Sequence, residues 1–181
     1  EKEEEFLYMD YDTRRNLQLT SSLHENGKAI TLWSFLDKCQ SAMGSRLLRK
    51  WIEKPLVSQK KIEERYARVD CLIQNFMQRQ RLQDALKAVY DLQRLVARCA
   101  MNTANPVDLV RLTRTLEVVP EIFSCITYDC FEAFQNTDTL QSLYAKLKDA
   151  FVETPPNVLT NGGVFKDGYN AMLDEARAIQ R

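Results

Sequence analysis

The sequence offers few side chains in patterns that support catalysis. Nucleophilic catalysis needs a base to accept the proton and a third group to orient that base, and the only histidine is His24, in the polar segment SSLHENGK. A dyad of His24 with Cys39 or a serine stays open as a minor hypothesis beside a solvated loop histidine. The acidic pairs Glu63–Glu64 and Asp174–Glu175 could bind a metal or exchange protons. Each is followed by a cation at helical pairing distance, which is typical of an exposed, solubilising helix face.

Motifs that bind phosphate or metal do not occur in the sequence. Neither G-x-x-x-x-G-K-[ST] nor G-x-G-x-x-G is present, and the glycines of NGGVFKDG have the composition of a turn. The cysteines, at positions 39, 71, 99, 125 and 130, form no C-x-x-C pair and lie among apolar helical positions. This favours reduced, buried thiols over a disulfide framework or a zinc site. We therefore predict no catalytic, cofactor-binding or metal-binding residue in this chain.

Local charge is the remaining candidate for a binding function. The chain has 25 Lys+Arg and 25 Asp+Glu, so its net charge exerts no long-range attraction on nucleic acid or anionic lipid. Eight cations nevertheless stand against three anions between positions 46 and 68. They could neutralise DNA phosphates, or pair with acids elsewhere in the fold or in a partner domain, and the sequence assigns no individual residue to DNA. The eight cations are Arg46, Arg49, Lys50, Lys54, Lys60, Lys61, Arg65 and Arg68.

The elements that position these residues are predicted to be mostly α-helical. Only five Gly and five Pro interrupt long runs of helix formers at helical spacing. The basic run begins on a helix for which Ser41 is the predicted N-cap and Lys54 the last residue, because Pro55 follows. Gly44 near its start suggests a neighbouring backbone packed close. At the N-terminus, FLYMDYD (6–12) predicts a strand or extended lead-in before Thr13 opens a short helix.

Further helices follow along the chain. Ser58 is predicted to cap a second one, whose apolar positions (62, 66, 69, 72, 73 and 76) share one face. A third continues to a possible break at Asp91. Asn105 is suited to an N-cap before Pro106, and Asp108 to the positive end of the helix dipole.

Three more helical stretches are predicted in the rest of the chain. The first, with apolar positions from Leu109 to Ile126, contains Pro120, which should kink it or split it in two. One further helix covers 140–151, a linker covers 153–163, and a last helix begins near Asp167. We expect an irregular multi-helix bundle with a short extended N-terminal segment. The acidic start EKEEE and the absence of a long apolar run favour a cytoplasmic protein without membrane contact.

Six segments resemble consecutive signatures of the MutS family of DNA mismatch repair proteins, in its bacterial form. The most specific are TRRNL (13–17), MGSRLL (43–48) and GYNAMLD (168–174). Cys39 and Ser41 stand where the family usually has threonine; Ser41 keeps the capping hydroxyl. The six segments are DYDTRRNLQL (10–19), FLDKCQSAMGSRLLRKWIEKPL (35–56), IEERYARVDCL (62–72), VYDLQRLVAR (89–98), NTANPVDLVRL (102–112) and GGVFKDGYNAMLDEAR (162–177).

The resemblance implies a place within a larger protein. It implies that residues 1–160 form a helical core or lever domain and that residues 161–181 start the helix leading toward a DNA clamp domain. It further implies partners in the remaining domains, in the second subunit of a dimer and, through the whole protein, in mismatched double-stranded DNA. ATP and magnesium would be bound by the whole protein and not by this chain.

Two functions are compatible with these observations. The first is a non-catalytic structural and coupling segment that links the gripping of mismatched DNA to an ATPase domain absent from this chain. The second is a stand-alone helical module for protein–protein interaction on the same scaffold. Size-exclusion chromatography and partner capture distinguish them: a segment cut from a larger protein should expose apolar surface at its ends, whereas a stand-alone module should be a well-behaved monomer or dimer.

Overall fold

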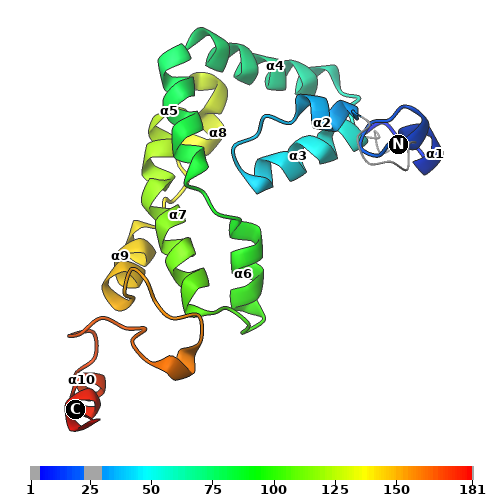
Figure 1. Ribbon diagram of the computed structural model, residues 1–181. Helices are drawn as coiled ribbons and strands as arrows, with labels where there is room; N and C mark the ends of the chain where they lie inside the picture. Colours follow the sequence, from blue (N-terminus) through cyan, green and yellow to red (C-terminus); the bar gives the residue numbers. More distant parts are fainter. Residues whose placement is uncertain (1–4, 23–29, 181) are drawn as a thin grey trace. The chain divides into compact units, whose positions relative to one another are not determined.

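A computed structural model describes residues 5–22 and 30–180 and is helical through most of that part (Figure 1). The predicted mostly α fold is therefore confirmed. In the described residues, extended pairing is limited to two isolated antiparallel bridges, Phe6–Leu56 and Phe151–Phe165. None of the described helices has both the length and the apolarity needed to cross a membrane. The α-helices are α1 (Tyr11–Asn16), α2 (Leu32–Leu36), α3 (Ala42–Glu53), α4 (Gln59–Gln74), α5 (Phe76–Lys87), α6 (Leu92–Ala100), α7 (Pro106–Ser124), α8 (Glu132–Gln135), α9 (Gln141–Ala150) and α10 (Ala171–Gln180), with 3-10 turns η1 (Asp129–Phe131) and η2 (Leu159–Asn161).

The chain divides into two compact units, and the first of them is discontinuous in sequence. The first unit contains the described residues up to Lys87 together with Cys125–Gln135, and the second contains Ala88–Ser124 and the described residues from Asn136 onward. The predicted boundary after residue 160 concerns roles within a longer protein and stays a prediction. His24 lies outside the described residues, so the dyad hypothesis with Cys39 stays a hypothesis.

The first unit begins with the predicted extended segment. The Leu7 N–H donates to the Pro55 carbonyl at 2.8 Å, which pairs this segment with the residues after α3. The following helix, α1, starts at Tyr11 because the Asp10 carboxylate accepts from the Thr13 N–H at 2.7 Å. The prediction that Thr13 opens the helix is therefore wrong by two residues, since an aspartate three residues earlier is the better cap.

Helix α3 has the predicted start and stop. The Ser41 hydroxyl accepts from the Gly44 N–H at 3.2 Å, and the helix ends at Glu53 with Lys54 as its C-cap. A Cβ atom on Gly44 would lie 3.2 Å from Ser41 Oγ and 3.4 Å from Cys39 Cβ. The expectation of a neighbouring backbone is wrong, because the side chains of the helix's own capping loop fill this space.

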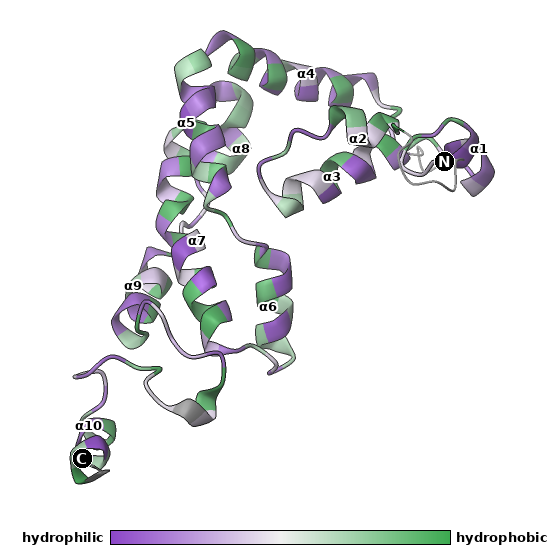
Figure 2. Ribbon diagram, viewed as in Figure 1, coloured by the Kyte–Doolittle hydropathy of each residue, from purple (hydrophilic) through white to green (hydrophobic). Residues whose placement is uncertain are grey.

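Helix α4 has one side packed and the other exposed. Ser58 occupies its N-cap position, but its side chain makes no capping hydrogen bond. On the packed side, Arg68 Nε donates to the Cys130 carbonyl of η1 at 3.1 Å. On the predicted apolar face, the exposed fractions are 69% for Tyr66 and 57% for Ile73. Apolar residues along α4 are visible in Figure 2, and within this chain much of this stripe is surface.

In the second unit, a buried carboxylate fixes the start of α7. The Asp108 carboxylate accepts from the Asn105 N–H at 3.1 Å, while the Asn105 side-chain oxygen accepts from the Asp108 N–H at 2.8 Å. Asp108 is only 1% exposed and pairs with Arg98 of α6 at 3.2 Å. The predicted break at Asp91 is confirmed, because Asp91 is the N-cap of α6. The two predicted caps thus determine where α6 and α7 begin.

Helix α7 continues through Pro120 to Ser124 as one helix. The expected split is therefore not found, and the alternative expectation, a kink at Pro120, stays a prediction. Proline has no N–H for the carbonyl four residues earlier, so the Leu116 carbonyl loses its helical donor. Gln141, the first residue of α9, supplies a replacement, because its Nε2 donates to the Leu116 oxygen at 3.3 Å. The two helices lie side by side in Figure 1, and they are packed against each other.

The last helix begins later than predicted. The Asn170 side chain accepts from the Leu173 N–H at 3.2 Å, and α10 starts at Ala171 instead of near Asp167. Gly168 has φ +84°, a left-handed conformation that no helical residue adopts. The chain therefore turns at Gly168 before the helix can begin. The predicted linker over 153–163 holds only the short turn η2.

Candidate functional site

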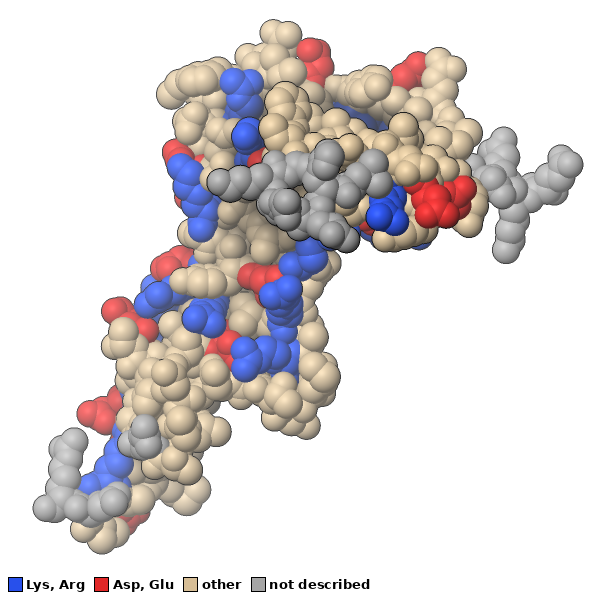
Figure 3. Space-filling model, turned by 45° about the vertical axis from the view of Figure 1, so that its right-hand side comes forward, with Lys and Arg blue, Asp and Glu red and all other residues tan. Residues whose placement is uncertain are grey.

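The basic run between Arg46 and Arg68 is partly used inside the first unit. Arg49 Nε pairs with Glu53 at 3.0 Å, and Lys61 Nζ pairs with Glu5 at 2.8 Å. The Arg65 guanidinium lies 3.8 Å from the centre of the Trp51 ring, which joins α4 to α3 by a cation–π contact. On the face shown in Figure 3, Lys and Arg alternate with Asp and Glu. Part of the basic run therefore serves contacts within the first unit.

Glu53 shows the electrostatics of these contacts. Partial burial by itself raises its pKa, but hydrogen bonds from Arg49 and from the Thr20 hydroxyl, at 2.8 Å, outweigh burial, and the pKa is lowered below 4.5. Three lysines differ from their neighbours, because Lys50, Lys54 and Lys60 have no ion-pair partner among the described residues. They are the cations of the run best placed to meet an external anion.

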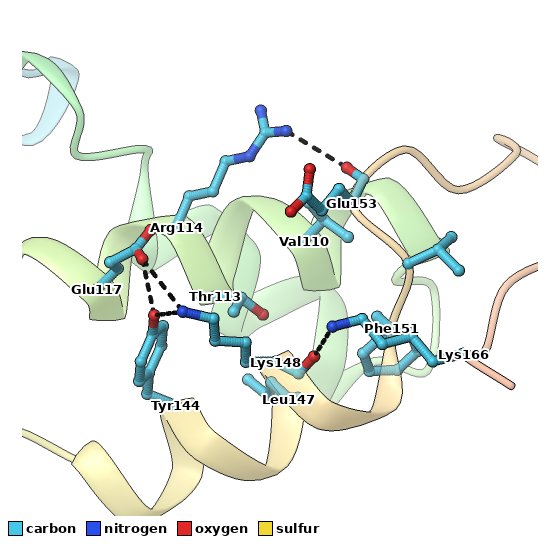
Figure 4. Close-up of a pocket in the computed structure, with 11 residues that line it drawn as sticks. Val110, Thr113, Arg114, Glu117, Tyr144, Leu147, Lys148, Phe151, Glu153 and Lys166 are labelled. Atoms are coloured by element: carbon cyan, nitrogen blue, oxygen red, sulfur yellow. Dashed lines mark hydrogen bonds and ion pairs between the residues drawn. The ribbon is translucent and has the colours of Figure 1, made fainter. Parts of the chain in front are cut away.

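A pocket of about 290 Å³ lies in the second unit between α7, α9 and the paired segments around Phe151 and Lys166. On one side, the Tyr144 hydroxyl donates to the Glu117 carboxylate at 2.7 Å and accepts from Lys148 Nζ at 2.7 Å (Figure 4). The hydroxyl of Tyr144, followed by the Glu117 carboxylate, raises the pKa of Lys148. The hydroxyl of Tyr144 thus links the Glu117 carboxylate of α7 to the Lys148 ammonium of α9.

The opposite side of the pocket closes the two helices onto the following chain. Arg114 donates to the Glu153 carbonyl at 3.3 Å, and Lys166 Nζ donates to the Lys148 carbonyl at 2.7 Å (Figure 4). The Lys148 carbonyl belongs to the last turn of α9, where helix carbonyls lack intrahelical donors. These polar groups join the walls of the pocket, so the arrangement fits a structural joint. The sequence predicts a helix over 140–151, but the helical spacing carries no sign that Tyr144 pairs with Glu117.

The thiols are free, and their environments differ from the prediction of uniform burial. Cys125 is 0% exposed, whereas Cys39 is exposed. Partial burial raises the pKa of Cys39, and a hydrogen bond with Asp37 raises it further. A nucleophilic cysteine needs a lowered pKa, so this environment does not activate the thiol. The described residues contain no group of three or more His, Cys, Asp or Glu side chains that could hold a metal ion.

The sequence motifs prove to be helix starts and turns. In the segment 168–174, the Gly168 N–H donates to the Asp174 carboxylate at 2.9 Å, and Asn170 caps α10. In the segment before 43–48, Asp37 accepts from the Ser45 hydroxyl and orients the loop that precedes α3. These residues therefore set the directions in which helices leave the loops.

Comparison with known proteins gives a match over nearly the whole chain. The family model described as MutS domain III matches residues 12–181. The chain belongs to the MutS domain III family. The helix caps described above are thus features of a MutS domain III chain, and the resemblance noted in the sequence is confirmed.

Several curated MutS proteins are similar to this domain III chain over nearly its whole length. The DNA mismatch repair protein MutS of Listeria welshimeri is 39% identical over 180 residues, covering 97% of this chain and 21% of the relative. The protein of the same name from Clostridium tetani is 35% identical over 177 residues, covering 96% and 20%. That from Macrococcus caseolyticus is 37% identical over 174 residues, covering 95% and 21%. The chain thus spans about a fifth of the length of these relatives.

Proposed function

We propose that this chain is a non-catalytic structural and coupling segment of a longer mismatch repair protein. It would link a part that grips mismatched DNA to an ATPase part, with ATP and magnesium bound outside the chain. Membership of the MutS domain III family supports this function, as does the name of its relatives, DNA mismatch repair protein MutS. The observation that carries it is the α7–α9 pair, whose polar contacts join both helices to each other and to the chain that follows.

A coupling element must transmit displacement without deforming. Helix α7 has 19 residues, which corresponds to a length of about 28 Å. Its first turn is fixed by Asp108, and its middle by Thr115, whose hydroxyl accepts from the Tyr90 N–H at 3.1 Å. Its second half is joined to α9 through Gln141. Closely packed interfaces of this kind shift between discrete arrangements and bend little, so a push at one end moves the other.

Exposed apolar side chains favour a segment of a larger protein over a stand-alone module. Met172 and Ile179 on α10 are 77% and 82% exposed, and the stripe on α4 is exposed as well. Monomeric soluble proteins rarely leave large apolar patches uncovered. We propose as partners the remaining domains of the longer protein, a second subunit and, through the whole assembly, mismatched double-stranded DNA. In this assignment residues 1–160 form the core or lever, and residues 161–181 lead toward a clamp.

The decisive experiment is a coupling measurement in the longer protein that carries this segment. Gln141→Leu removes the hydrogen bond between α9 and α7, and Ser142→Leu, on the same turn but exposed and without such a contact, is the matched control. We expect Gln141→Leu to reduce the stimulation of ATP hydrolysis by mismatched DNA severalfold and to leave the rate without DNA unchanged. Ser142→Leu should leave both rates unchanged.

The isolated chain provides the second test. It should hydrolyse no ATP, and it should bind matched and mismatched duplexes equally weakly, with an affinity that falls steeply as salt rises. Lys50→Gln, Lys54→Gln and Lys60→Gln combined should weaken that binding. Unchanged stimulation in the Gln141→Leu protein would refute coupling through this helix pair. Tight mismatch discrimination by the chain alone would refute the whole assignment.

A further inference from the structure

Two cysteines from distant parts of the sequence meet in the first unit. Cys71 lies in the last turn of α4, and Cys130 is the central residue of η1, which packs on α4. Arg68, one turn before Cys71 on the same helix, donates to the Cys130 carbonyl at 3.1 Å. The side chain of Cys130 is close enough to the Cys71 thiol to raise its pKa. Both thiols are free and only half-buried.

The contacts around the two thiols hold them at a helix–turn junction and not on a loose loop. The Asn75 side-chain amide donates to the Cys71 carbonyl at 2.7 Å and lies 3.9 Å from its sulfur. On the other side, the Arg68 guanidinium lies 5.7 Å from the centre of the Phe134 ring, in the helix that follows η1. Arg68 therefore contacts the returning segment at Cys130 and again at Phe134, which holds this segment against α4 beside Cys71.

We propose that Cys71 and Cys130 form a reversible disulfide when the protein meets a small-molecule disulfide such as oxidised glutathione. One protein thiolate attacks a sulfur of the small disulfide, forming a mixed disulfide and releasing one small thiol. The second protein thiol loses its proton and attacks the mixed disulfide, forming the Cys71–Cys130 bond and releasing the second small thiol. The two protein thiols are oxidised by two electrons, and the small disulfide is reduced.

The environment of Cys71 suits it to the second step. Burial raises its pKa, and the neighbouring Cys130 raises it further, so little of it is thiolate at neutral pH. A thiol of this kind is a slow first attacker but can resolve a mixed disulfide held next to it.

The bond would have a defined structural effect. It closes a loop of about 60 residues that contains α5, α6 and α7, and such loops are the ones a disulfide stabilises most in the chain-entropy model. Both sulfurs belong to the first unit, so the bond locks the returning segment 125–135 onto α4. It also adds a covalent link between α4 and η1, which are otherwise held together by packing and hydrogen bonds. Oxidation is therefore expected to stiffen the first unit.

The test uses the full 181-residue chain, equilibrated with excess oxidised glutathione or with dithiothreitol, then alkylated and mapped by mass spectrometry. We expect a monomer in which Cys71 and Cys130 are linked to each other, while Cys39, Cys99 and Cys125 carry either the alkylating group or a glutathione adduct. Cys71→Ser and Cys130→Ser should each abolish the linkage, and the control Cys39→Ser should retain it. Alkylation of both thiols in the oxidised sample, or linkage through another cysteine, would refute the proposal.

Thermal unfolding provides a readout that needs no variant. The melting temperature of the wild-type chain should rise by several degrees on oxidation and return on reduction, because the long loop is closed in the unfolded state. An unchanged melting temperature in a sample shown to carry the bond would contradict the stiffening. The outcome is independent of the coupling experiment, since that experiment is run with reduced thiols and probes α7 and α9.

Discussion

The hydrogen bond from Gln141 to the Leu116 carbonyl should contribute measurably to the free energy of unfolding. It does so because Pro120 has no N–H to bond that carbonyl. Gln141→Leu removes the donor and leaves the carbonyl of Leu116, a residue only 4% exposed, without a partner. Loss of one such bond costs about 1 kcal/mol of unfolding free energy, and Leu and Gln have similar helix propensities. With a urea slope of about 2 kcal/mol/M, the unfolding midpoint should fall by about 0.5 M.

A double-mutant cycle tests whether Gln141 stabilises the protein by replacing the hydrogen bond that Pro120 removes. Pro120→Ala supplies an N–H that can bond the same Leu116 oxygen, so this variant alone should gain about 1–2 kcal/mol of stability. In the Pro120→Ala background Gln141 is no longer needed at that carbonyl, and Gln141→Leu should cost only the exposed hydrogen bond from Gln141 Nε2 to the Thr139 carbonyl. The coupling energy between the two positions is therefore expected to be about 1 kcal/mol. An equal cost of Gln141→Leu in both backgrounds would refute the compensation.

Two further predictions concern buried charge and acid stability. Asp108→Asn removes the charge that faces Arg98, and we expect a loss of about 2 kcal/mol in urea unfolding, below the value for a fully buried pair because the Arg98 side chain is 44% exposed; a loss under about 0.5 kcal/mol would contradict this role. The pKa of Glu53 is lowered on folding, so its carboxylate adds stability above pH 4.5 that is lost as pH falls through the folded value. Glu53→Gln should therefore lose less stability than wild type between neutral pH and the acid side of that pKa, and parallel pH profiles would show that the shift is absent.

Helix starts were predictable because a cap acts over three residues. Ser41 and Asn105 bond the N–H groups of Gly44 and Asp108, and the spacing of these residues is visible in the sequence. The same local argument placed the break at Asp91. Asp10 was missed because a second polar residue, Thr13, stood in the same segment and offered an alternative cap.

The failures arise where a distant residue decides the outcome. Pro120 does not split α7 because its lost bond is replaced by Gln141, a residue that periodicity cannot connect with it. The stripe on α4 was identified as apolar, but a pattern of spacing cannot say whether its cover lies within the same chain. The helix over 140–151 was predicted, but the hydrogen bond from the Tyr144 hydroxyl to Glu117 of another helix has no counterpart in the spacing of the sequence.

The discontinuity of the first unit imposes an order on how the protein can fold during synthesis. Arg68 and its acceptor Cys130 are 62 residues apart, and Ala88–Ser124, which belong to the other unit, are made between them. At about 5–20 residues per second, a ribosome needs roughly 2–8 s to produce that intervening stretch. Throughout this interval the side of α4 that later packs on η1 is without its partner, and the nascent chain presents it to solvent or to chaperones.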